Sequence, residues 1–232
     1  MACQGEVGTM SDRAEVLDSV RRNLAAAGSP CEEVLPDINR EHLGSDKEEL
    51  ARRLQKECEA VSTSVHLLHD VEHAARTLNE LASERKVAKL AVSHDPLARA
   101  ISAQAIGAHD VVAPDADKAE IEQSDMGLSG ARMAIAEHGT FVLVPDDDGC
   151  RLVSLLPPQH VIAISKDQIL GTLAEALQQL VATGSDSPPA NVTFVSGPSR
   201  TADIEQNLVT GIHGPAQLDI FLIDDTRGLT SQ

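Results

Sequence analysis

The chain has 232 residues, 42% hydrophobic and 24% charged, a balance typical of a globular protein long enough to bury a full core. Its net charge of −17 argues against a nucleic-acid partner, because phosphate backbones are bound by clusters of Lys and Arg. No apolar run is long enough to span a bilayer and the N-terminus lacks a signal-peptide pattern, so we expect a cytoplasmic protein without a membrane span.

Two amphipathic helices are expected before the first strand. The first runs from Ser11 to about Ala27, and the second covers Lys47–Val61. The segment between them, Ser29–Ser45, contains Pro, Asn and Gly and is the best candidate for a boundary. We therefore divide the chain into an N-terminal tail and helical segment, residues 1–62, and an α/β domain, residues 63–232.

From Ser64 onward, strands and helices are expected to alternate, which is typical of α/β folds. The expected strands are Ser64–His69, Ala88–Ser93, Val111–Ala113, Thr140–Val144, Leu152–Leu155, Val161–Ile164, Asn191–Val195 and Ala216–Asp224. The expected helices are Val71–Lys86, Pro96–Ile106, Gly127–Glu137, Lys166–Thr183 and one from Ser199 to Gly211, while Asp115–Ser124 is either a short helix or a loop. A turn-rich link of hairpin length, residues 145–151, predicts some antiparallel pairing. The fold class predicted is a three-layer α/β sandwich with a mixed, mostly parallel sheet, preceded by N-terminal helices.

The stretch from Asn191 to Asp224 predicts a strand, a turn, a helix, a second turn and a strand of a parallel sheet. Both turns would then lie at the ligand-binding edge of the sheet, and the first would offer N–H groups and hydroxyls to an anion. We expect the two turns to share a pocket that includes His213. His160, just before the strand expected at Val161–Ile164, is a second candidate. For both histidines, a hydrogen-bonded loop residue without a ligand is an equally good explanation. The candidate ligand-binding residues in these turns are Ser196, Gly197, Ser199, Thr201, His213 and Gly214.

Glu137 precedes a strand in Glu137-His138-Gly139-Thr140, where a tuned carboxylate can act as a general base or nucleophile. A solvated glutamate in a turn is the more common alternative. Arg151 follows three consecutive aspartates and offers a cation to a carboxylate or phosphate. Those aspartates diverge along the chain and predict a solvated turn.

Metal ligation is not supported by the histidine and cysteine spacing. His66, His69 and His73 cross from an expected strand into a helix, which makes a shared metal site awkward. The four cysteines show no C-x-x-C spacing, which excludes local zinc-ribbon or ferredoxin-like motifs and favours free thiols. The cysteines are Cys3, Cys31, Cys58 and Cys150.

Four sequence pieces occur in one order that resembles a known family. They are Gly130–Thr140, Leu155–His160, Ser196–Glu205 and Gly211–Pro215. This order resembles the LUD-domain family, and within it the lactate utilization protein C group (LutC, also called YkgG). The resemblance implies a NagB/RpiA/CoA-transferase-like fold, with ligands over the carboxyl ends of strands. It also implies oxidation of L-lactate to pyruvate together with two iron–sulfur proteins, which are LutA-like and LutB-like.

Because its cysteines offer no cluster motif, this chain would be a non-redox or accessory subunit that binds no cofactor, while the resemblance implies iron–sulfur clusters in the partner proteins. A small carboxylate or phosphate would be contacted by Arg151, His160 or His213, in a pocket lined by Glu137 and Thr140. Two alternatives remain open: a stand-alone enzyme acting on a sugar phosphate or acyl-CoA, with Glu137 as base or nucleophile, and a sensor of a small acid. Each requires the Thr140 loop and the Ser196 turn to meet over one rim of the sheet.

Overall fold

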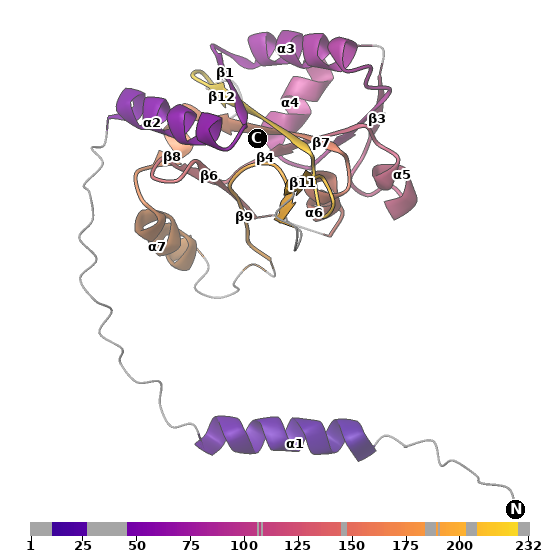
Figure 1. Cartoon of the computed structure of the whole chain (residues 1–232), viewed down its shortest axis with the longest axis vertical. Coiled ribbons are helices and arrows are strands. Elements are labelled where there is room, and N and C mark those ends of the chain that lie inside the picture. Colours follow the sequence, from indigo (N-terminus) through magenta and orange to yellow (C-terminus); the bar gives the residue numbers. More distant parts are fainter. Residues whose placement is uncertain are drawn as a thin grey trace, which may run out of the picture. The chain divides into compact units, whose positions relative to one another are not determined.

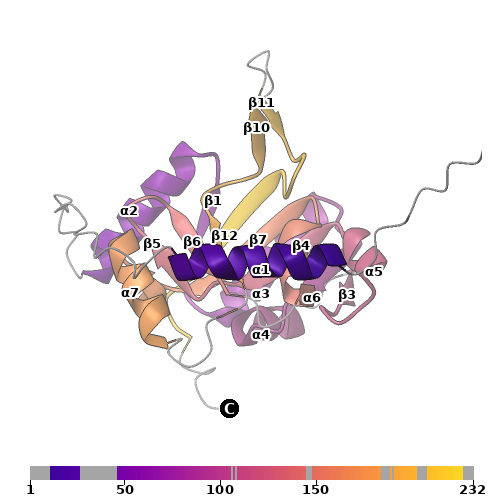
Figure 2. The same cartoon turned by 90° about the horizontal axis from the view of Figure 1, so that it is seen from below.

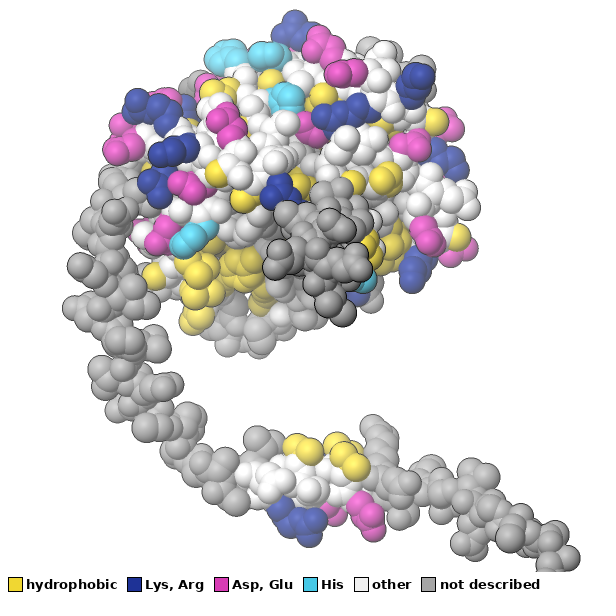
Figure 3. Space-filling view, viewed as in Figure 1, with side chains coloured by type: hydrophobic (Ala, Val, Ile, Leu, Met, Phe, Trp, Pro, Cys, Tyr) yellow, Lys and Arg dark blue, Asp and Glu magenta, His cyan; other side chains and the backbone are white. Residues whose placement is uncertain are grey.

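The computed structural model describes residues 11–26, 46–105, 107, 109–144, 148–183, 189, 191–202 and 208–226, and Figures 1 and 2 show the elements from two sides. The chain divides into two compact units, Met1–Glu41 and His42–Gln232. The first contains helix α1 (Ser11–Ala26), which confirms the predicted helix. Hydrophobic side chains lie along one side of α1 and charged ones along the other (Figure 3). The domain boundary predicted at residues 62 and 63 stays a prediction.

The second unit is built on a six-stranded sheet in the order β1-β12-β7-β4-β2-β3, within the described residues. Its strands are β1 (Ser64–Leu68), β2 (Lys89–Val92), β3 (Asp110–Val112), β4 (Met126–Gly130), β7 (Gln159–Ser165) and β12 (Gln217–Ile223). Each neighbouring pair is parallel. From β2 the chain moves outward to β3 and then returns to the other side of β2 as β4. The order of strands therefore reverses between β2 and β4, where open α/β sheets bind their ligands.

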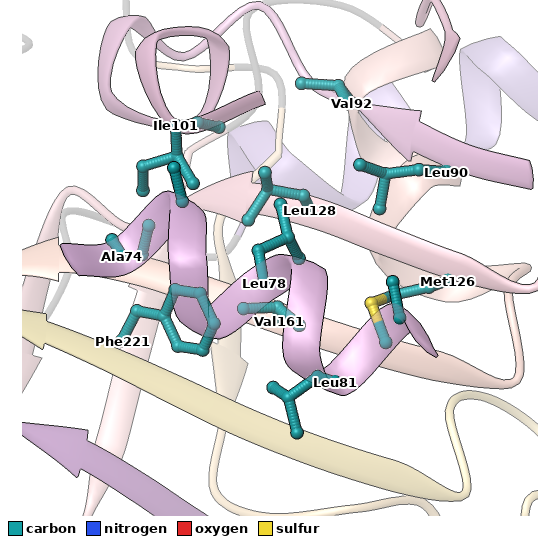
Figure 4. Packing of buried hydrophobic residues seen from close by; sticks show 14 of the residues in the cluster. Ala74, Leu78, Leu81, Leu90, Val92, Ile101, Met126, Leu128, Val161 and Phe221 are labelled. Atoms are coloured by element: carbon teal, nitrogen blue, oxygen red, sulfur yellow. The ribbon is translucent and has the colours of Figure 1, made fainter. Parts of the chain in front are cut away.

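Helices α3 (Val71–Glu84) and α4 (Pro96–Gln104) cover one face of this sheet (Figure 1). The core beneath them joins Leu78 of α3 and Ile101 of α4 to Leu128 of β4 and Phe221 of β12 (Figure 4). Since all four side chains are fully buried, truncating any of them would leave a cavity in a close-packed layer.

A smaller four-stranded sheet, in the order β8-β5-β6-β9, packs against the opposite face through a second core. Its strands are β5 (Met133–Ile135), β6 (Thr140–Leu143), β8 (Ile169–Leu170) and β9 (Thr193–Val195). Helix α2 (Lys47–Ala60) joins this core through Leu54 and Cys58, and α7 (Leu173–Thr183) covers the outer face through Ala176. Helices α5 (Lys118–Glu122) and α6 (Asp148–Leu155) pack beside β2 and β3.

The predicted three-layer α/β class with N-terminal helices is confirmed. Antiparallel pairing, however, lies outside the six-stranded sheet: β6 pairs with β5 and β9 in the smaller sheet, and a separate antiparallel pair follows β9 in sequence. In the described part of the chain, none of the helices combines the length and apolar character that crossing a bilayer requires.

Three sequence expectations about secondary structure are wrong. Gly127–Glu137 forms β4 and β5 in place of a helix, because a strand buried on both faces lacks polar alternation. At Gly127 a Cβ would lie 2.2 Å from the carbonyl oxygen of Val153, so a glycine is needed where α6 crosses β4. Leu152–Leu155 ends helix α6 and is not a strand. Lys166–Thr183 begins with a short 3-10 turn (Lys166–Gln168) and strand β8 before α7 starts.

The helix expected from Ser199 to Gly211 is also wrong. Strands β10 (Arg200–Ala202) and β11 (Leu208–Thr210) form an antiparallel pair there, and the intervening residues 203–207 lie outside the described residues. Figure 2 shows this pair projecting from the body. The expected aspartate turn at 146–148 lies mostly outside the described residues, and Asp115–Ser124 resolves into a loop with the short helix α5.

Candidate functional site

A cavity of about 250 Å³ lies at the carboxyl ends of β2 and β4, where the strand order reverses. Leu143 and Thr193 of the smaller sheet, together with Val144 directly after β6, also line it. This is the location at which parallel α/β sheets bind ligands. Besides Thr193, the polar residues that line it are Ser93, Asp95, Ser129, Arg132, Ser154 and Gln168.

Asp95 is held at one side of the cavity as the N-cap of α4. Its Oδ1 accepts hydrogen bonds from the backbone N–H groups of Leu97 (2.9 Å) and Ala98 (3.1 Å). A Cβ on Gly130 would lie 2.0 to 2.2 Å from the carboxylate atoms of Asp95. The glycine at the end of β4 therefore makes room for the carboxylate.

The floor of the cavity contains Ser129, whose Oγ lies 2.8 Å from Nε2 of His160. Ser129 is 3% exposed and His160, on the neighbouring strand β7, is 1% exposed. Burial lowers the pKa of His160 to about 4, so the imidazole is neutral at physiological pH. His160 is not among the residues that line the cavity, but it contacts Ser129, which is.

Arg132 supplies a cation at the rim, and its backbone is fixed from two sides. The Arg132 N–H donates to the carbonyl of Val142 (2.9 Å). The side-chain amide of Gln168 donates to the carbonyls of Ala131 (3.1 Å) and Arg132 (3.0 Å), while its oxygen accepts from the N–H of Ser165 (2.9 Å). The arginine is exposed, so its guanidinium can receive an anion from solvent.

The two loops that the sequence places together do meet. Oγ1 of Thr140 lies 2.7 Å from Oγ of Ser196. The Ser199 N–H donates to the carbonyl of Pro215 (2.8 Å), and the Gly211 N–H donates to the carbonyl of Ser199 (2.9 Å). The Ser-Gly-Pro-Ser turn is therefore joined both to Thr140 and to the turn that carries His213.

Their location differs from the expectation. Strand β9 pairs with β6 in the smaller sheet, and the turn containing Gly214 leads into the amino end of β12. The expectation that these turns lie at a carboxyl end of the parallel sheet is therefore wrong. His213 is exposed, and the side chain of Thr201 is outside the described side chains. None of these turn residues lines the cavity at β2 and β4, and their ligand roles stay predictions.

The comparison with known proteins agrees with the motifs of the second half of the chain. The LUD domain family matches residues 51–223. This chain belongs to the LUD domain family. It is similar to Lactate utilization protein C of Exiguobacterium sp., with 28% identity over 94% of this chain and 98% of that protein. It is also similar to Lactate utilization protein C 1 of Bacillus mycoides, with 32% identity over 78% of this chain and 82% of that protein.

A solved structure supports the fold of this LUD domain. The crystal structure of a DUF162 family protein from Deinococcus radiodurans matches with a TM-score of 0.58 and 21% identity, over 78% of this chain and 99% of that one. The suspected membership of the family is thus confirmed, together with the fold class.

Glu137 and Arg151 are the two remaining site residues that the sequence predicts. Glu137 accepts a hydrogen bond from the Leu173 N–H (3.2 Å) at the start of α7, and its side chain is 40% exposed. Among the described residues, Nε of Arg151 is buried without a hydrogen-bond partner. Arg151 lies on α6 three residues before Ser154, which lines the cavity and whose hydroxyl donates to the Arg151 carbonyl (2.8 Å). A catalytic role for Glu137 and an anion-binding role for Arg151 stay predictions.

Sequence reasoning missed an ion pair that lies in the amino half of β12. Arg85 donates to both oxygens of Asp219 (2.6 and 3.0 Å), and Nε2 of His66 lies 3.0 Å from the same carboxylate. Burial raises the pKa of Asp219, but the hydrogen bonds from His66 and Arg85 outweigh it, so the net pKa is lowered. The hydrogen bond with Asp219 in turn raises the pKa of Arg85. This cluster ties the end of α3 to β1 and β12.

The three closely spaced histidines do not converge. His66 contacts Asp219, whereas the His69 N–H donates to Nδ1 of His73 (3.4 Å). Within the described residues, no group of three or more His, Cys, Asp or Glu side chains is placed to hold a metal ion. Asp95 and the cavity serines were missed as well, although the Ser-His-Asp-Pro sequence after a strand is a detectable signal of a helix cap at a strand end.

Proposed function

We propose that this chain acts in lactate utilization and binds a small carboxylate in the cavity between β2 and β4. The curated relatives described above carry the name Lactate utilization protein C, which supports the process. The cavity at the reversal of strand order carries the proposal for the site. A volume of about 250 Å³ corresponds to the liquid volume of about eight waters, which suits an acid of a few carbons.

The lining of the cavity has the chemistry that such an acid requires. Arg132 at the rim can bind a carboxylate through two parallel N–H donors. Deeper in, the hydroxyls of Ser93, Ser129 and Ser154 belong to residues that are more than nine-tenths buried. Hydroxyls both donate and accept, so they can bond the oxygen substituent of the acid.

We further propose that the chain is a subunit without a redox centre, whose partners are the LutA-like and LutB-like iron–sulfur proteins. Its cysteines have no spacing for a local cluster motif. Cys58 is buried against the carbonyl of Gly139, and burial, with the charges of Glu59 and Glu57, raises the pKa of its thiol to about 12. Since metals bind the thiolate, Cys58 is a poor ligand.

Calorimetric titration of the full chain with L-lactate tests the binding site. Binding is expected, and Arg132→Ala should weaken it by about tenfold or more, because a charge-assisted bond to the carboxylate is lost. Arg76→Ala, which removes an exposed arginine on α3, is the matched control and should leave the affinity unchanged. Equal binding by wild type and Arg132→Ala would contradict the proposed site.

Reconstitution tests the subunit role separately. Lactate oxidation is measured with the purified LutA-like and LutB-like proteins, with and without this chain. A rate that rises when the chain is added supports the accessory role, whereas an unchanged rate shows that this role is wrong even if the chain binds lactate.

A further inference from the structure

We propose that a second cleft, between helix α4 and strand β3, binds an amphipathic acid, which has one carboxylate and an apolar tail of several carbons. The cleft has a volume of about 410 Å³ and lies beside the outermost strand β3 of the six-stranded sheet. Among the described residues, Ser93 is the one that lines both this cleft and the cavity between β2 and β4. The inference concerns a different site and does not rest on the binding of lactate.

The cleft is present because the helical layer stops before β3. Leu90 of β2 and Val111 of β3 are partners in register, so their side chains lie on the same face of the sheet. Leu90 is 1% exposed in the core beneath α3 and α4, whereas Val111 is 56% exposed. Ala113 and Pro114, which follow β3, extend the apolar surface. One side of the cleft is therefore an apolar part of the sheet that the helices leave open.

Helix α4 supplies the other side with Arg99, Ser102 and Ala103. Residues three and four apart lie on one face of a helix, and Ala98 and Ile101 on the opposite face are fully buried in the core. The Arg99 side chain is exposed, and in the part of the chain that the structure describes its guanidinium has no carboxylate or carbonyl partner. A free cation beside apolar surface is complementary to an anion whose remaining part is apolar.

The size and lining of the cleft define the class of acid. Its volume corresponds to the liquid volume of about fourteen waters, which is room for an acid of about eight carbons. Each methylene that is fully buried strengthens binding by about fourfold. A short hydroxy acid such as lactate has no tail to bury, so this cleft favours a different class of acid. The apolar residues that would contact the tail are Val92, Ala103, Val111, Ala113 and Pro114.

Calorimetric titration of the full chain with octanoate and with butyrate tests the role of the tail. The two acids carry the same carboxylate, and octanoate has the longer apolar chain. Because the cleft is open, its added methylenes are only partly covered. Octanoate is therefore expected to bind wild type about tenfold or more tighter than butyrate does.

Two variants of the cleft test its position. Arg99→Gln keeps a polar side chain on α4 but removes the charge, and it should weaken octanoate binding by about tenfold. Val111→Asp replaces apolar surface with a carboxylate that repels the ligand, and it should weaken binding by about tenfold or more. The matched controls are Arg76→Gln on the exposed side of α3 and Leu67→Asp on β1, where Leu67 is 58% exposed at the other edge of the sheet. Both controls should bind octanoate as wild type does.

The inference is overturned if wild type does not bind octanoate or binds it no better than butyrate. It is also overturned if either cleft variant, shown by thermal melting to be folded, keeps the wild-type affinity. If Val111→Asp does not fold, Arg99→Gln decides alone. The absence of lactate binding would contradict the proposed function and leave this result unchanged, so the two failures are distinguishable.

Discussion

Replacing His160 with Gln should remove part of the acid sensitivity of this protein's stability. His160 is fully buried beside Ser129, and burial lowers its pKa to about 4 from an ordinary value of 6.5. Between those two pH values the unfolded chain binds a proton at this position that the native protein does not bind. The stability it contributes is complete above pH 6.5 and is lost as the pH falls toward 4.

The size of the effect follows from the two pKa values. Each pH unit within this window costs about 1.4 kcal/mol of unfolding free energy. Lowering the pH from 7 to 5 should therefore cost wild type about 2 kcal/mol through His160 alone. For a unit of this size that corresponds to about 4 to 8 °C in Tm. Gln does not titrate, so the variant should lack this contribution.

Urea denaturation of both proteins at pH 7 and pH 5 measures the difference. The other histidines are shared, so their contributions cancel when the two pH-dependent losses are subtracted. The lower pH of 5 also keeps Asp219 ionised, because its net pKa is lowered and its contribution is lost only in more acidic solution. Equal losses of stability in wild type and His160→Gln would refute the reasoning. Direct titration of the His160 ring by NMR provides a second measurement.

Two further predictions concern buried groups outside the cavity. Asp219→Asn should lower the free energy of unfolding, measured by urea denaturation, by about 3 kcal/mol. This is the lower end of the range for a broken buried ion pair, because the Arg85 side chain is 23% exposed. A loss below about 1 kcal/mol would contradict the prediction. Cys58 should not react with a thiol reagent in the native protein at pH 8, since a pKa of about 12 leaves about one thiolate in ten thousand. In the native state, wild type and Cys58→Ala should then give equal counts of reactive thiols. In the unfolded state, wild type should give one more reactive thiol than the variant. A difference between the two native proteins would show that the Cys58 thiol is accessible.

The elements that the sequence predicts well carry local signals. Helices α3 and α4 each follow an aspartate whose side chain caps the first turn, namely Asp70 and Asp95. Strands β7 and β12 contain the apolar runs Val161–Ile164 and Ile220–Ile223, and such runs are typical of a buried parallel strand.

The elements that fail depend on distant partners. The glycine- and alanine-rich segment that forms β4 and β5 has no alternating pattern, because both faces of β4 are covered by other elements. Strand β9 looks like a member of the parallel sheet until its pairing with β6 is known. This one non-local pairing therefore places the Ser196 turn at the end of a strand of the smaller sheet and not at the carboxyl end of a strand of the parallel sheet.

The candidate site divides in the same way. The meeting of Thr140 and Ser196 is predicted from motif order, and a hydrogen bond joins the two side chains. The cavity at Asp95 and Ser129 requires β4 to lie beside β2 and the smaller sheet to close over both. No local sequence pattern predicts either of these contacts between elements, so the residues of this cavity can be identified only from the structure.

The position of β12 bears on how the chain is made. Among the strands of the described residues, β12 is the last in sequence, yet it lies between β1, the first of them, and β7. While a ribosome is still synthesising the protein, β1 has no neighbour to pair with in this sheet, and the pairing must close across more than 150 residues once β12 has emerged. A nascent chain stopped before Gln217 would carry β1 and β7 with unpaired edges, a state that invites association with other chains and protection by chaperones.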